Sequence, residues 1–192
     1  MYVYGEDMRV TEVQALAALA HPLRSRVLEL LKVEGAATVG MLAQRTGEAV
    51  GSLSHHVKVL AGCGLVVEVP ELARDRRERW WDLASDSLSW STATFQDDPV
   101  ASIVAAAAAS MNLERHAAKV RTWQAVPEEE REGWQSGPFS TDKWVRVSDA
   151  ELAEIAEEVQ AVFDRWAARP APADDAPRRT VFLFAHGVPA EP

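Results

Sequence analysis

The chain has 192 residues, of which 47% are hydrophobic and 26% are charged, and this is the composition of a globular protein with a sizeable buried core. Its single cysteine, Cys63, excludes a disulfide framework and a cysteine-based zinc site, and it fits a reducing, cytoplasmic location. No apolar run reaches the ~18 residues that a membrane span needs, and the first ten residues lack the basic and apolar regions of a secretory signal, so we expect no membrane partner.

The charge is distributed unevenly along the chain. The formal net charge is −9, which by itself argues against binding to nucleic acid. Residues 21–81, however, carry nine Lys and Arg against seven Asp and Glu, whereas residues 91–192 carry ten against seventeen. Because the local charge attracts a phosphate, the N-terminal part remains a candidate for binding DNA.

The N-terminal part reads as short helices followed by a β-hairpin. Pro22 suits the first turn of the second helix, Thr38 is a plausible cap for the third, and Gly47 makes a tight turn into the fourth. This order predicts a winged helix-turn-helix. The expected helices cover residues 11–20, 22–33, 39–46 and 50–62, and the expected strands cover residues 65–72 and 76–84, with a hairpin tip at 73–76.

The fourth helix has two unlike faces. On a helical wheel, Val50, Leu53, Val57 and Leu60 share the side that we expect to be buried. The other side carries small hydroxyls, a histidine and a lysine, which can contact base edges and phosphates in a major groove. The alternative is an exposed helix with an ordinary polar face. The predicted DNA-contacting residues of this helix are Gly51, Ser52, Ser54, His55 and Lys58.

The hairpin tip is rich in arginine. Arg74, Arg76 and Arg77 are predicted to contact a DNA backbone or a minor groove, with the strongest expectation for Arg76 and Arg77. Arg79 is a weaker candidate because strand alternation can turn it away. The alternative is a solvated turn, since three acidic residues in the hairpin partly neutralise it: Glu71, Asp75 and Glu78.

Four segments, in order and at compatible spacing, resemble the ArsR-type winged-helix transcriptional regulators over roughly residues 12–84: "LAHPLRSRVLELL", "TVGMLAQRTG", "SLSHHVKVLAGCGLV" and "RDRRERWWDL". The resemblance implies a homodimer on a two-fold-symmetric operator, which represses until an effector releases it. It also places Ser52, Ser54, His55 and Lys58 on the recognition helix.

Departures from this pattern argue against metal sensing. Met41, Leu42 and Ala43 stand where one group of metal-sensing members carries a Cys-x-Cys pair. Other members bind zinc through Asp, His and Glu on a C-terminal helix. The nearest candidate here is His116, with Glu114 nearby, but no second histidine follows within the next few turns. We therefore predict no metal and no other cofactor.

The second half reads as a separate region. Residues 85–98 form a connection, so we place a winged helix-turn-helix domain at 1–90 and a C-terminal dimerisation and effector domain at 91–192. Asp98 and Pro99 open a long helix, and Ser148 with Glu151 forms a capping box for another. Residues 143–147 and 178–188 are expected to be paired strands. The predicted fold class is mainly α with small β (α+β), with a helical or α+β C-terminal domain.

Two further sites are expected there. One face of the long helix is the candidate dimer interface, although packing inside one subunit is a close alternative; it comprises Val100, Ile103, Val104, Ala107 and Met111. Large apolar side chains could line a pocket for a small hydrophobic ligand, although they are more often core; these are Trp123, Trp134, Trp144, Trp166 and residues 181–184.

The sequence thus favours a sequence-specific DNA-binding transcriptional regulator, a repressor that binds a palindromic operator as a homodimer. The alternative from the acidic total charge is a winged-helix protein-interaction module without sequence-specific DNA binding. An enzyme is not expected, since the second half has no nucleophile elbow, phosphate loop, metal triad or credible pair of carboxylates, and no catalytic residue is predicted.

Overall fold

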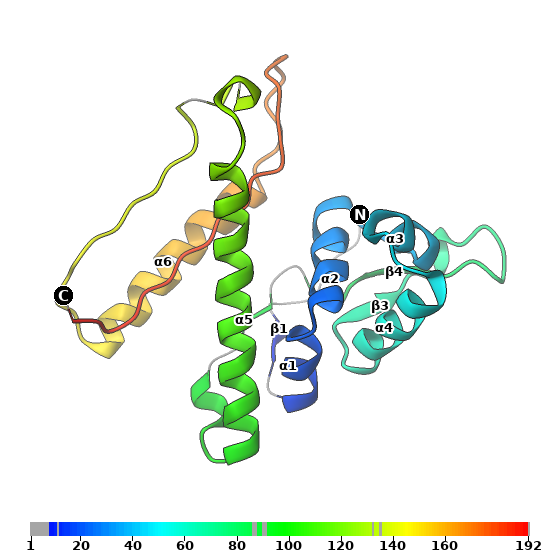
Figure 1. Cartoon of the computed structure of the whole chain (residues 1–192), viewed down its shortest axis with the longest axis horizontal. Helices are drawn as coiled ribbons and strands as arrows, with labels where there is room; N and C mark the ends of the chain where they lie inside the picture. Colours follow the sequence, from blue (N-terminus) through cyan, green and yellow to red (C-terminus); the bar gives the residue numbers. More distant parts are fainter. Residues whose placement is uncertain are drawn as a thin grey trace. The chain divides into compact units, whose positions relative to one another are not determined.

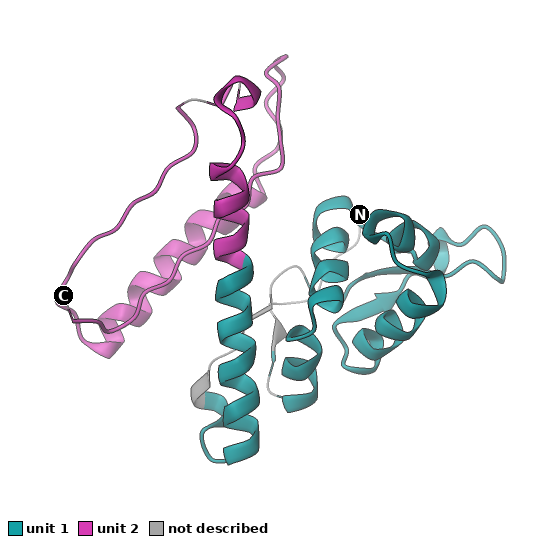
Figure 2. Ribbon diagram, viewed as in Figure 1, with its two compact units in different colours: residues 1–115 teal, residues 116–192 magenta. Residues whose placement is uncertain are grey.

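The computed structural model describes residues 8–10, 12–85, 88–89, 92–131, 133–134 and 136–191. It contains two compact units, Met1–Arg115 and His116–Pro192 (Figure 2). The division between these units lies after the expected domain boundary at residue 90, because residues that follow this boundary are buried in unit 1. The assignment of separate functions to residues 1–90 and 91–192 stays a prediction.

Unit 1 holds a helix-turn-helix and a small sheet (Figure 1). Its first four helices are α1 (Val13–Leu19), α2 (Pro22–Glu34), α3 (Val39–Thr46) and α4 (Val50–Gly62). The antiparallel sheet has the order β2-β4-β3, formed by β2 (Ala37–Thr38), β3 (Val66–Glu68) and β4 (Trp80–Leu83). Two helices joined by a tight turn and followed by the β3–β4 hairpin make a winged helix-turn-helix, as the sequence predicts.

Local signals explain where these helices begin and end. The Thr38 hydroxyl accepts a hydrogen bond from the Met41 amide at 3.3 Å, which satisfies a free donor in the first turn of α3. The ring nitrogen Nδ1 of His21 accepts one from the Leu23 amide at 3.2 Å and so caps α2. Gly47 has a φ of 77°, in the left-handed region that favours glycine, and it turns the chain from α3 into α4.

The core of unit 1 lies between the four helices and the sheet. Leu53, Val57 and Leu60 of α4 are fully buried, as their spacing predicts. Val50 is expected on the same face, but it is 58% exposed, because the first turn of α4 extends beyond the core. Other fully buried side chains come from α1, α2, α3 and the start of the hairpin: Leu16, Val27, Leu31, Leu42, Leu65 and Val66.

The hairpin differs from the expectation in length and partners. Its strands are shorter than predicted, because Pro70–Leu72 forms a 3-10 turn and residues 73–79 form the tip. A proline lacks the amide hydrogen that a strand ladder needs, which explains the early end of β3. The sequence did not predict that β2 pairs with β4, nor that β1 (Met8–Arg9) pairs in parallel with β5 (Leu88–Ser89), inside the expected connection.

The helix α5 (Pro99–Gln124) begins at Pro99, as predicted, but as far as Arg115 it belongs to unit 1 and not to a separate C-terminal unit. The Asp98 carboxylate accepts hydrogen bonds from the amides of Val100 and Ala101, at 2.8 and 3.1 Å, which caps the helix. Three small side chains of α5 are buried in the core of unit 1 together with Phe95, the last residue of the 3-10 turn η2 (Thr92–Phe95); they are Ala101, Ala105 and Ala108. Arg115 binds α2 by a 2.6 Å hydrogen bond from its Nη1 to the Ser25 hydroxyl and by an ion pair with Glu29 at 3.5 Å.

Unit 2 holds the end of α5, the 3-10 turn η3 (Glu128–Arg131) and α6 (Asp149–Ala167). The capping box of Ser148 and Glu151 is present, as predicted. The expected strand pair at 143–147 and 178–188 is wrong, since the described residues 136–191 contain no strand. The rings of Phe182 and Phe184 lie 5.0 and 5.2 Å from the His116 ring on α5, so side-chain packing on a helix replaces the expected strand pairing.

The fold class is therefore confirmed as α+β: a mostly helical chain with a small three-stranded sheet, in which a winged helix-turn-helix precedes a helical C-terminal region. Within the described residues, none of the helices combines the length and apolarity that crossing a membrane would need.

Candidate nucleic-acid interface

The outward face of α4 carries the five residues that the sequence singled out. Gly51, His55 and Lys58 are exposed, and Ser52 and Ser54 are half-buried at the margins of this face. The helix contains no Asp or Glu, so no carboxylate of α4 repels a phosphate. Hydroxyl, imidazole and ammonium groups on one helix face are donors and acceptors that can contact base edges and phosphates in a major groove.

The first turn of α4 is open. Its N-cap residue, Ala49, has no side chain that can accept a hydrogen bond from the amides of this turn. A methyl group added at Gly51 would have no atom within 4 Å. Free amides at a helix N-terminus attract anions, and the lack of a side chain at Gly51 allows close approach to them.

The tip of the wing is a defined turn. The Asp75 carboxylate accepts hydrogen bonds from the amides of Arg77 and Glu78, at 2.7 and 3.0 Å. The Glu78 carboxylate accepts one from the Arg74 amide at 2.8 Å. Both acidic groups therefore organise the backbone, and within the described part of the chain neither Arg74, Arg76 nor Arg77 forms an ion pair.

Arg79 lies in a different environment from the tip. Its Nε donates to Glu68 at 3.0 Å, which makes an ion pair across the two arms of the hairpin. An exposed pair of this kind contributes only about 0–1 kcal/mol to stability, but it occupies the guanidinium. Arg79 is thus less available to DNA than Arg76 and Arg77, whose side chains are exposed at the tip.

His21, the N-cap residue of α2, lies against one of the two adjacent histidines of α4. The ring centroids of His21 and His56 are 4.6 Å apart, and those of His55 and His56 are 5.5 Å apart. Burial lowers the pKa of His56 below its usual 6.5, and the positive charges of His21, Arg24 and His55 lower it further. His56 is therefore neutral near pH 7 and packs between helices.

Sequence reasoning did not include His21 and Arg24 in the candidate site. His21 caps the N-terminus of α2 and Arg24 lies in its first turn, and only the fold brings His21 beside α4. The sequence shows only that polar residues, His21 and Arg24, stand near the start of α2, and this does not indicate which helix packs against them.

The residues predicted to form the dimer interface lie on one side of α5. Val100 and Ile103 are 68% and 71% exposed, and Ala107 and Met111 are exposed as well, while Val104 is half-buried. This face lies beside the alanines that enter the core of unit 1, about 100° around the helix. Val104, at the margin between the two faces, packs against that core. Among the described residues, no group of three or more His, Cys, Asp or Glu side chains could hold a metal ion.

The fold and this site define the class: a protein with a winged helix-turn-helix. Residues 19–69 match a family described as "Helix-turn-helix domain". The match runs from the end of α1 through β3 and includes both helices of the motif. It supports a DNA-binding regulator, as the sequence predicts, without identifying the ArsR-type subgroup.

Two solved structures are similar to the chain. A transcriptional regulator from Thermotoga maritima is 16% identical, with 83% of this chain and 90% of that chain covered, at a TM-score of 0.33. An apo-form mutant of ZitR from Lactococcus lactis is also 16% identical, with 81% and 83% covered, at a TM-score of 0.29. At TM-scores of 0.33 and 0.29, these similarities do not indicate the function of the chain. No curated protein matches the sequence significantly.

Proposed function

We propose that this protein is a sequence-specific DNA-binding transcriptional regulator that binds a palindromic operator as a homodimer and represses transcription. The observation that carries the proposal is the outward face of α4, which has no acidic residue and presents Ser52, His55 and Lys58 beside an open first turn. The helix-turn-helix match over residues 19–69 supports it.

In this proposal, α4 enters the major groove and the wing lies over the flanking backbone. Ser52, Ser54 and His55 contact base edges, and Lys58 binds a phosphate or a guanine. Arg74, Arg76 and Arg77 contact the backbone or an adjacent minor groove, since the acidic groups of the tip are bound to backbone amides.

The homodimer, the palindromic operator and the role as a repressor are inferred from the resemblance to ArsR-type regulators and from the exposed face of α5. One recognition helix reads only a few base pairs, so a symmetric dimer is needed for a specific site. The exposed face of α5 is proposed to form this dimer. A cytoplasmic location, the absence of a metal cofactor and the absence of enzymatic activity are parts of the same proposal.

The test is fluorescence anisotropy of the purified chain with duplexes from the upstream region of its own gene and with a shuffled control, over a series of salt concentrations. We expect one duplex to bind tightly, with log affinity falling linearly as log salt concentration rises. Lys58→Ala should weaken binding and reduce the salt slope by about 2, because each of the two protomers loses one phosphate contact. Lys143→Ala in unit 2 is the matched control and should leave both quantities unchanged.

If no duplex binds at low salt, the proposal is wrong and the winged helix serves as a protein-interaction module. In that case, Lys58→Ala and Arg76→Ala would leave partner binding largely unchanged. If binding occurs with equal affinity for the shuffled duplex, the protein binds DNA without reading its sequence, and the assignment of base contacts to α4 fails.

A further inference from the structure

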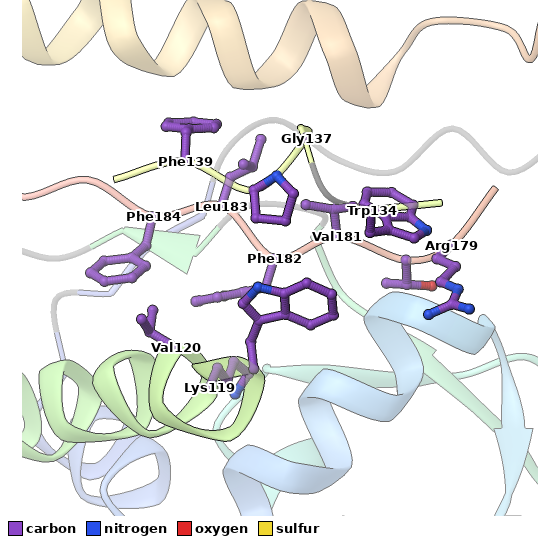
Figure 3. A pocket seen from close by; sticks show the side chains of 13 residues that line it. Lys119, Val120, Trp134, Gly137, Phe139, Arg179, Val181, Phe182, Leu183 and Phe184 are labelled. Carbon is purple, nitrogen blue, oxygen red and sulfur yellow. The ribbon is translucent and has the colours of Figure 1, made fainter. Parts of the chain in front are cut away.

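Unit 2 contains a cavity of about 360 Å³ (Figure 3). Its walls come from three segments of the unit: the last turns of α5, the residues around Gly137, and residues 179–184. All of these lie within His116–Pro192. The volume is near the lower end of the range for small-molecule sites, which is about 300–1,000 Å³, and it suits a ligand of one or two rings.

The walls are mostly apolar, and their aromatic side chains are not packed as a core. Trp123, Trp134 and Phe184 are half-buried, while Phe139 and Phe182 are 76% and 43% exposed. Buried aromatic side chains normally contact one another closely, without space for a ligand between them. Here they surround a hollow, so a planar apolar ligand would cover surface that now faces water.

The charged groups in this lining have one sign. Lys119 and Arg179 line the cavity, and no Asp or Glu does, although unit 2 as a whole has more acidic than basic residues. The Lys119 ammonium lies 5.1 Å from the centre of the Phe182 ring, so one cation is held at an aromatic wall. A ligand with a negative charge would meet two cations and no repelling carboxylate in the lining.

Arg179 is the better candidate for contacting that charge. Among the described residues it forms no ion pair, whereas its neighbour Arg178 is bound to Asp174 at 2.6 Å. A guanidinium can donate two parallel hydrogen bonds to a carboxylate, which adds directional recognition to charge attraction.

We propose that this cavity binds a small planar aromatic compound that carries a carboxylate, with the ring against the aromatic walls and the carboxylate at Arg179. This inference goes beyond the proposed function and does not depend on it, because the cavity lies wholly in unit 2. If the protein regulates transcription, such a compound is its candidate effector.

Isothermal titration calorimetry of the full chain, without DNA, tests the proposal. The probes are 2-naphthoate and its neutral analogue 2-naphthamide, which have nearly the same size and shape. We expect naphthoate to bind at least about tenfold more tightly than the amide, since a charge-assisted bidentate contact is worth more than a neutral one. Arg179→Gln should weaken naphthoate binding about tenfold and leave the amide unchanged.

Arg178→Gln is the matched control: it removes a neighbouring arginine outside the lining, and both affinities should stay as in the wild type. Val120→Phe places a larger side chain in the lining and should weaken both probes, which locates the binding in this cavity. Circular dichroism verifies that each variant is folded.

The proposal is overturned if naphthoate gives no binding heat, if the two probes bind equally, or if Val120→Phe has no effect. An equal loss in Arg178→Gln and Arg179→Gln overturns the role of Arg179. Because these titrations contain no DNA, their failure is distinct from a failure of the DNA-binding experiment.

Discussion

At the scale of single residues, His56 shows how position changes chemistry. Its sequence context, between His55 and a buried valine, does not distinguish a DNA contact from an internal one. In the fold it lies beside His21, and its Nδ1 is buried without a hydrogen-bond partner among the described residues. Burial is the main cause of its lowered pKa, and the charges of His21, Arg24 and His55 act in the same direction, with Glu48 opposing.

This pKa predicts how stability depends on pH. The unfolded chain has the higher His56 pKa, so it takes up the proton first as the pH falls. The free energy of unfolding should therefore be lower at about pH 5.5 than at about pH 7.5, because the pH has then fallen below the unfolded value of 6.5 and the lowered pKa of folded His56 opposes protonation. In His56→Gln this decrease should be smaller, as measured by urea denaturation at both pH values.

His186→Gln is the control, because His186 lies in unit 2, outside this cluster. It should retain the wild-type dependence on pH. An unchanged dependence in His56→Gln would mean that His56 titrates alike in the folded and unfolded chains.

At the scale of elements, α4 combines a buried face with an outward face that has little role in folding. Leu53, Val57 and Leu60 hold the helix in the core. Gly51, in contrast, has free space around the position that a side chain would take. Glycine weakens a helix relative to alanine, so the fold by itself does not explain why glycine occupies this position.

Gly51→Ala should therefore separate stability from binding. We expect the free energy of unfolding to rise by about 0.5 kcal/mol, because alanine favours the helix and the new methyl group has room. We expect DNA affinity to fall about tenfold, because the methyl group would stand between the first turn of α4 and the phosphates. Thermal unfolding and fluorescence anisotropy measure the two effects.

Gly62→Ala makes the same change at the last residue of α4, where an added Cβ also has no atom within 4 Å. It should leave DNA affinity as it is in the wild type. Full DNA affinity in Gly51→Ala would show that α4 does not approach DNA by its first turn.

At the scale of the whole molecule, α5 raises the question of assembly. Its alanines at 101, 105 and 108 are buried in unit 1, whereas Val100 and Ile103 are mostly exposed. The sequence left open whether the larger apolar residues pack inside one subunit or between two. Their exposure in the described chain is compatible with a second copy covering them, and the dimer remains a prediction.

Ile103→Glu should weaken this dimer by about tenfold or more, because it places a charge in an apolar contact. The stability of the single chain should change little, since Ile103 is 71% exposed. Sedimentation velocity over a concentration series measures the dimer, and anisotropy should show weaker operator binding in parallel. Val33→Glu, at another exposed apolar residue of unit 1, is the control and should remain dimeric.

A wild-type chain that sediments as a monomer at all concentrations would contradict the predicted dimer. A wild-type dimer that Ile103→Glu leaves intact would place the interface elsewhere.

The local features of this protein follow from its sequence alone. Thr38 and Ser148 cap helices through contacts within one turn, Gly47 turns the chain by its own backbone freedom, and the spacing of Leu53, Val57 and Leu60 defines a buried face. These features depend on neighbouring residues only. For the same reason, the sequence pattern is sufficient to select the outward face of α4 and the arginines of the wing as candidates for binding DNA.

The meeting of distant segments, in contrast, depends on the tertiary structure. The fold places His21 beside His56, adds β2 to the hairpin, and packs Phe182 and Phe184 on α5 instead of in a strand pair. An apolar run such as residues 181–184 gains from burial against a strand or a helix alike, because the hydrophobic effect has no direction. The partner of such a segment depends on contacts across the whole chain, which no local pattern contains.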